Sequence, residues 1–314
     1  MTKPTHIPAS FFGMVLGLSG LGQAWRVAVK LWSMPEWIGE AILLLASLVW
    51  LVLFISYIRQ CIRHPAQSRQ EFLHPVQGST PALLAVSTLL IGMASFRYST
   101  IAGTFLIVLG IGWHLLFSLW HTGAQWKGQR QFIDTTPALY LPTVAGNFVS
   151  GAALGVIGCA QWGWLFLGAG FFSWLSIESL IIKRLWSDNS LPTMQRPLIG
   201  IQFAPPVVCL MAALNLTQDL LSSPFLLMLW GYGLYQLMIG IRLHRWLGEQ
   251  AFSPAYWSYT FGIAATTVST LKLALAGNQP AMMLSMPIFI LANLFIGVLA
   301  LRSGKLFVKA KLTK

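Results

Sequence analysis

One stretch of this chain, residues 257–267, combines residue types that could form a polar path through an apolar environment. It belongs to a segment, 255–275, that is long and apolar enough to cross a bilayer as a helix. Within it, small and hydroxyl residues recur at i, i+4 spacing and share one helix face: Ser258, Gly262, Thr266 and Thr270. Such a face either lets another helix pack closely or borders a water-filled path.

A large ring, Phe261, stands beside that face, next to Ala265 and directly before Gly262. In a narrow path lined by glycine and alanine, a ring of this size would block permeation. The other interpretation is that Phe261 packs against a neighbouring helix. Both interpretations fit the sequence.

Few charged residues fall inside the apolar segments. Glu178 is the only acidic residue deep in one, where an ionised group is costly and commonly functional. Two roles fit it: a structural one, hydrogen-bonded or paired with the nearby Lys183 or Arg184, or a titrating role in transport. Lys272, near the end of 255–275, either attracts anions or, as we expect, extends toward the membrane interface.

No pattern in the sequence indicates a metal, a cofactor or an enzyme. His114 and His121 are seven residues apart and share a helix face, but further metal ligands are not evident. Phosphate-binding glycine loops, nucleophile elbows and HExxH motifs are absent. The cysteines are widely separated and form neither a disulfide framework nor a zinc motif: Cys61, Cys159 and Cys209.

The composition is that of a protein embedded in a lipid bilayer. Hydrophobic residues make up 56% of the 314 residues and charged residues only 9%, against roughly 25% charged in a soluble domain. The net charge of +12 does not indicate nucleic-acid binding, because no soluble basic domain carries it. We predict one membrane domain over 1–314, with both chain ends included.

Ten apolar segments are long enough to span the membrane, and short turns join them in pairs. The predicted fold is therefore an all-α membrane protein of five helical hairpins, 10–59, 76–121, 137–185, 197–244 and 255–302. A proline stands at or just before the start of each hairpin: Pro8, Pro75, Pro137, Pro197 and Pro254. These hairpins constitute a structural repeat.

Lysine and arginine residues concentrate on one side of this arrangement. The links between hairpins and the two ends of the chain carry most of them. The other side has only Arg26, Lys30, Arg97 and Lys272. Both termini are therefore predicted to be cytoplasmic.

The first helix of each hairpin differs from the second. First helices carry interior helix breakers, such as Pro81, Pro142 and Pro205, together with most uncharged polar groups. Because freed backbone groups are costly in lipid, these helices belong inside, around a central pore. The predicted lining includes Ser87, Thr143, Asn147, Ser258, Gly262 and Ala265. Hydroxyl and N–H donors without a ring of carboxylates suit small inorganic or organic anions.

Over about 7–303 the chain resembles the tellurite-resistance and dicarboxylate transporter family, to which plant slow-type anion channels are distantly related. The resemblance rests on Phe12-Gly13 with Leu16-Gly17, His74-Pro75-Val76, Tyr140 to Ala145, Asn147-Phe148, Leu167 to Gly170, Ala204-Pro205, Trp230 to Gly233, and Trp257-Ser258 with Phe261-Gly262. It implies ten helices around a pore, a homotrimer, occlusion by Phe261 and a lining that includes Gly13. It also implies anion conduction, dicarboxylate or sulfite export, or tellurite resistance.

We therefore predict an anion channel of the bacterial inner membrane, gated by Phe261 and without a cofactor. The absence of fixed counter-charges in the expected lining favours a channel over a tightly coupled carrier. The alternative is a proton-coupled exporter of dicarboxylates or toxic oxyanions, with Glu178 as the titrating group. A membrane scaffold without transport is a third hypothesis, which the lack of a sizeable soluble domain disfavours.

Overall fold

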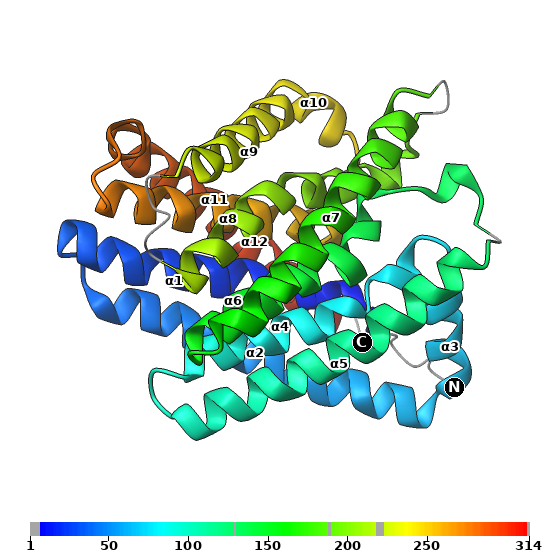
Figure 1. Cartoon of the computed structure of the whole chain (residues 1–314). Helices are drawn as coiled ribbons and strands as arrows, with labels where there is room; N and C mark the ends of the chain where they lie inside the picture. The colour runs from blue at the N-terminus through cyan, green and yellow to red at the C-terminus, as the bar shows by residue number, and fades with distance from the viewer. Residues whose placement is uncertain (1–6, 129, 188–189, 218–222, 313–314) are drawn as a thin grey trace.

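The computed structural model describes residues 7–128, 130–187, 190–217 and 223–312. Over these residues the chain is helical, and its long helices run roughly along one direction as a bundle (Figure 1). The α-helices are α1 (Gly13–Trp32), α2 (Glu36–Arg63), α3 (Pro65–Leu73), α4 (Ala82–Ser95), α5 (Thr100–Trp126), α6 (Gly146–Val156), α7 (Ala160–Leu185), α8 (Pro205–Leu216), α9 (Pro224–Arg242), α10 (His244–Leu247), α11 (Ser258–Leu275) and α12 (Gln279–Leu312).

Eight described segments are long and apolar enough to cross a membrane. Three of them, 77–95, 137–156 and 193–216, are 83–94% buried, whereas the other five are only 22–28% buried. The helices α1 and α11 are not among the eight, but most residues of α11 are buried. Buried and exposed segments thus alternate along the chain, as the sequence predicts for the first and second members of hairpins.

The buried helices form a closed ring of contacts. In chain order, α1 contacts α4, α4 contacts α6, α6 contacts α8, and α8 contacts α11. The ring closes because α11 contacts α1. The exposed helices α2, α5, α7, α9 and α12 each pack against the buried helix that precedes them.

Each buried α-helix is preceded by a segment of 3₁₀ or π turns, which are tighter or wider than the turns of an α-helix. These segments are η1 (Ala9–Phe12), η2 (Gln77–Ser79), η4 (Pro137–Leu139) with the π-helical η5 (Leu141–Ala145), η6 (Thr193–Phe203) and η7 (Pro254–Trp257). The prolines of the repeat belong to these irregular segments or flank them, and not to the first turn of each α-helix as the sequence predicts. A further short turn, η3 (Phe132–Asp134), follows α5.

The prolines expected inside the bundle are buried. Pro142 lies within η5, Pro81 caps α4, and Pro205 opens α8. A proline has no N–H to donate, so the turn around it leaves a carbonyl that lipid cannot satisfy. Placement among neighbouring helices removes this cost and explains why these particular helices are inside.

The contact between α1 and α11 is unusually close. A Cβ atom added to Gly17 would lie 2.3 Å from the Thr260 hydroxyl oxygen, and one added to Gly20 would lie 2.6 Å from the Ala264 Cβ. Small residues of this kind let helix backbones approach in a membrane protein. The close contact holds the first and last members of the ring together.

Candidate functional site

Among the described residues of the five buried segments, two cavities bear on the predicted pore. The large cavity has a volume of about 370 Å³ and the small cavity about 150 Å³. Along α1, Gly13 and Leu16 line the large cavity, whereas Gly20 and Gln23 line the small one. The same order holds along α4, α6, α8 and α11, so the two cavities lie end to end along the ring.

Of the residues that the structure describes, Phe261 is the one that lines both cavities. Its side chain is 6% exposed and belongs to the second turn of α11. The junction between the cavities is therefore at this side chain.

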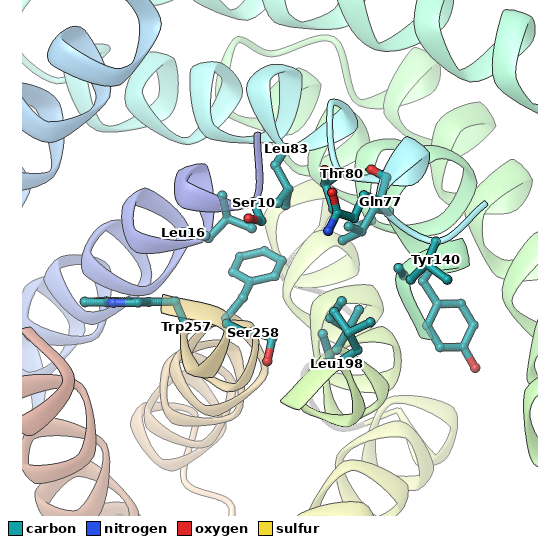
Figure 2. Close-up of a pocket in the computed structure, with 18 of the residues that line it drawn as sticks. Ser10, Leu16, Gln77, Thr80, Leu83, Tyr140, Leu198, Trp257 and Ser258 are labelled. Carbon is teal, nitrogen blue, oxygen red and sulfur yellow. Dashed lines mark hydrogen bonds between the residues drawn. The ribbon is translucent and has the colours of Figure 1, made fainter. Parts of the chain in front are cut away.

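The large cavity is bounded mainly by apolar groups with a few neutral polar ones. Figure 2 shows side chains from the starts of α1, α4 and α11 around one space: Ser10, Leu16, Gln77, Thr80, Trp257 and Ser258. The Thr80 hydroxyl donates to the Gln77 carbonyl at 2.7 Å, and the Ser258 hydroxyl donates to the Pro197 carbonyl. The described residues that line this cavity include no aspartate, glutamate, lysine or arginine.

Among the described residues, one charged side chain lines the small cavity: Lys272, on the last turns of α11. Its ammonium group donates to the Asn215 side-chain oxygen at 2.5 Å. Asn215 and Gln23 line the same cavity. The Lys272 side chain therefore faces this cavity, and its extension toward the membrane interface stays a prediction.

Three of the residues predicted to line a pore, and the predicted gate Phe261, border these cavities. Gly13 and Ser258 border the large cavity, Ala265 borders the small one, and Phe261 borders both. These positions come from the first and last buried helices, which are the two in closest contact.

The remaining predicted lining residues, Ser87, Thr143, Asn147 and Gly262, border neither cavity. Ser87 donates to the Leu84 carbonyl within its own helix at 3.0 Å. Asn147 donates to the Thr143 carbonyl at 2.6 Å, and its side-chain oxygen lies 3.0 Å from the His114 ring. Gly262 faces the backbone of Phe203. All four therefore contact neighbouring protein groups.

The cavity-facing side of α11 lies beside the hydroxyl face, from which Ser258 alone, among the described lining residues, borders a cavity. Its residues have the helical spacing i, i+4, i+7, i+11: Phe261, Ala265, Val268 and Lys272. The hydroxyls bond within the bundle instead: Thr266 donates to the Gly262 carbonyl at 2.8 Å, and Thr270 to the Thr266 carbonyl at 2.7 Å. The Trp230 indole N–H donates to Thr270 at 2.9 Å. The spacing of Val268 and Lys272 after Phe261 was the signal that could have identified this face.

Glu178 on α7 lines neither cavity and accepts hydrogen bonds from five side chains. The donors are Tyr140 at 2.5 Å, Tyr232 at 2.7 Å, Trp174 at 2.8 Å, Gln202 at 2.9 Å and Gln236 at 3.3 Å. The hydroxyl of Tyr140 points away from the other labelled cavity side chains (Figure 2). Within the described residues, Glu178 forms no ion pair with Lys183 or Arg184.

The two histidines do not come together with other metal ligands. No group of three or more histidine, cysteine, aspartate or glutamate side chains in the described part of the chain could hold a metal ion. His121 stacks on Phe117 with ring centroids 5.5 Å apart and lies 3.2 Å from the Ser79 hydroxyl. Both histidines are packed between helices.

The fold and the two cavities define a polytopic helical membrane protein of the channel or transporter class. A family model described as the voltage-dependent anion channel SLAC1 matches residues 6–303, and the chain belongs to this family. This confirms the predicted family resemblance. An anion channel family is not an enzyme family, in agreement with the sequence analysis.

Individual relatives span bacteria, archaea and plants. The chain is 31% identical to the tellurite resistance protein TehA homolog of Haemophilus influenzae, over 98% of this chain and 95% of that protein. It is 24% identical to the uncharacterized transporter MJ0762 of Methanocaldococcus jannaschii, over 71% of this chain and 72% of the relative. It is 25% identical to the S-type anion channel SLAH2 of Arabidopsis thaliana, over 85% of this chain and 52% of the plant protein.

Proposed function

We propose that this protein is an anion channel whose path runs through the two cavities and is closed by Phe261. In this proposal the chain forms ten transmembrane helices, arranged as five hairpins around a central pore. The observation that carries it is that Phe261, alone among the described residues, borders both cavities, at the point where a continuous path would be interrupted. Membership of an anion channel family supports the same function.

The chemistry of the lining favours anions over cations. Cation pathways commonly use rings of carboxylates, and no carboxylate in the described part of the chain borders either cavity. Among the described lining residues, the polar side chains are amides, hydroxyls and the His74 imidazole, with one ammonium group at Lys272. Such groups attract small inorganic or organic anions without holding them tightly. An association with tellurite resistance is proposed from the name of the Haemophilus relative.

The proposed setting is a bacterial inner membrane with both termini cytoplasmic. The large cavity lies at the end of the bundle where α2 ends with Arg59 and Arg63 and where α7 ends with Lys183 and Arg184. By the preference of lysine and arginine for the cytoplasmic side, the large cavity opens to the cytoplasm. We further propose a homotrimer with one pore per subunit, as the family resemblance implies.

Truncation of Phe261 tests the gate. In Phe261→Ala the benzyl group that separates the cavities is removed, so anion current in oocytes or planar bilayers should rise about tenfold or more. A chloride or nitrate current through purified, folded protein is the measurement.

Phe105→Ala is the matched control, because it removes the same side-chain atoms from α5, where Phe105 is 65% exposed. Its current should equal that of the parent. A Phe261→Ala protein that folds normally but conducts no better than Phe105→Ala would contradict the proposed gate.

The alternative is a proton-coupled exporter, in which Glu178 carries the proton. Anion uptake by vesicles under an imposed pH gradient, with and without Glu178→Gln, separates the two functions. Uptake that follows the gradient and is lost in Glu178→Gln would favour the exporter. Gradient-independent flux that survives the substitution would exclude it.

A further inference from the structure

Among the described residues that line the two cavities, Lys272 is the only lysine, arginine, aspartate or glutamate. It lies on the same face of α11 as Phe261, eleven residues further along. At 1.5 Å of helix rise per residue, this places its Cα about 16 Å from that of Phe261. The positive charge is thus inside the small cavity and beyond the proposed gate.

The charge of Lys272 is held in place by a neutral partner. Asn215, from α8, accepts a hydrogen bond from the ammonium group but brings no negative charge. Within the described residues, the ion pairs of the protein join Arg26, Arg97 and Arg196 to glutamates, and none includes Lys272. The nearby Lys30, exposed on α1, adds a second positive charge.

Donor groups from three helices border the small cavity. A lysine ammonium has three N–H donors, and Asn215 occupies one of those of Lys272. The amides of Asn215 and of Gln23, on α1, provide further N–H donors to the same space. A positive charge, two amides and no carboxylate form a set that stabilises an anion and repels a cation.

We propose that Lys272, Asn215 and Gln23 form a binding site for a small monovalent inorganic anion, such as a halide or nitrate, in the small cavity. This inference rests on the proposed function, since it makes the small cavity the chamber in which an anion is held beside the closed gate. The attraction of Lys272 is stronger there than in bulk water, because low-dielectric protein surrounds the cavity.

Two substitutions remove the net positive charge in different ways. Lys272→Gln deletes it and keeps most of the side-chain length. Asn215→Asp keeps the shape of the partner and its hydrogen bond to Lys272 but neutralises the ammonium with a carboxylate. A merely structural link between α8 and α11 would survive Asn215→Asp, whereas an anion site would not.

Lys30→Gln is the control, because it removes the same charge from the same end of the bundle without touching the cavity lining. Equal effects of Lys30→Gln and Lys272→Gln would mean that the charges act only as a diffuse field. That outcome would overturn the site.

Bromide provides a direct measurement of binding that does not depend on conduction. Crystals of the parent protein soaked in bromide should give an anomalous peak beside the Lys272 ammonium. Lys272→Gln and Asn215→Asp should lose this peak, and Lys30→Gln should keep it. Absence of the peak in the parent, or its persistence in Asn215→Asp, would overturn the proposal.

Conductance provides the functional measurement, in the Phe261→Ala background. The bromide concentration for half-maximal current from the small-cavity side should rise about tenfold in Lys272→Gln and in Asn215→Asp, and less than about twofold in Lys30→Gln. An unchanged half-maximal concentration in both site variants would contradict the inference. If Phe261→Ala conducts no anion, the proposed channel function fails, and the bromide peak still decides whether the site exists.

Discussion

Glu178 shows how a single carboxylate organises groups from several elements. Its five donors come from α7 itself, from α9, and from the irregular starts of two buried segments at Tyr140 and Gln202. The side-chain oxygens of Gln202 and Gln236 are buried without a partner among the described residues. Both amides thus direct their N–H groups toward the carboxylate, which is the stronger acceptor. The arrangement supports a structural role for Glu178.

Glu178→Gln should therefore destabilise the protein. A glutamine offers one acceptor oxygen and an NH₂ group that opposes the surrounding donors, so we expect a loss of about 2–3 kcal/mol. Thermal unfolding in detergent measures it. Tyr232→Phe, which removes a single donor to Glu178, should cost about 1 kcal/mol. A stability of Glu178→Gln equal to that of the parent would show that the carboxylate is not the organising group.

At the scale of elements, the contact of α1 with α11 determines where the gate residue is held. Gly17→Ala would place a methyl group 2.6 Å from the Thr260 Cβ and 2.3 Å from its hydroxyl, so the helices must separate. We expect a loss of about 1–3 kcal/mol in stability, measured by thermal unfolding. Gly112→Ala on α5, where an added Cβ meets nothing within 4 Å, should be neutral or slightly stabilising. Equal stability of the two variants would refute the close packing.

The helical elements were largely predictable from the sequence, but the face of α11 that borders the cavities was not. The lengths of the apolar segments and the positions of the prolines predict where the helices lie in the sequence, because a bilayer requires long apolar helices. Polarity was a poor guide to the cavity face, because Thr266 and Thr270 satisfy their hydroxyls on the carbonyls of their own helix. A threonine hydroxyl in a helix can therefore be hydrogen-bonded without facing a water-filled path. The cavity face carries Phe261, Val268 and Lys272, whose placement depends on how five helices meet.

The 3₁₀ and π segments before the buried helices could also not be predicted from the sequence. Proline positions indicated where each buried helix begins, but not that Pro197 lies inside a 3₁₀ segment of 11 residues. The choice between α, 3₁₀ and π turns involves small energies that tertiary contacts decide. Glu178 supplies one such contact, through Gln202 in η6 and Tyr140 beside η5.

At the scale of the whole molecule, the native cysteines can test the proposed orientation. Cys159 is exposed and follows α6, whose Val156 borders the small cavity, whereas Cys61 is partly exposed near the basic end of α2. The Cys61→Ser variant keeps Cys159, and a membrane-impermeant maleimide should label it in intact cells. The Cys159→Ser variant keeps Cys61, and it should stay unlabelled until the membrane is permeabilised. Cys209 is buried and should not react in either variant. The reverse pattern would place the large cavity outside the cell, and Lys272 would then face the cytoplasm.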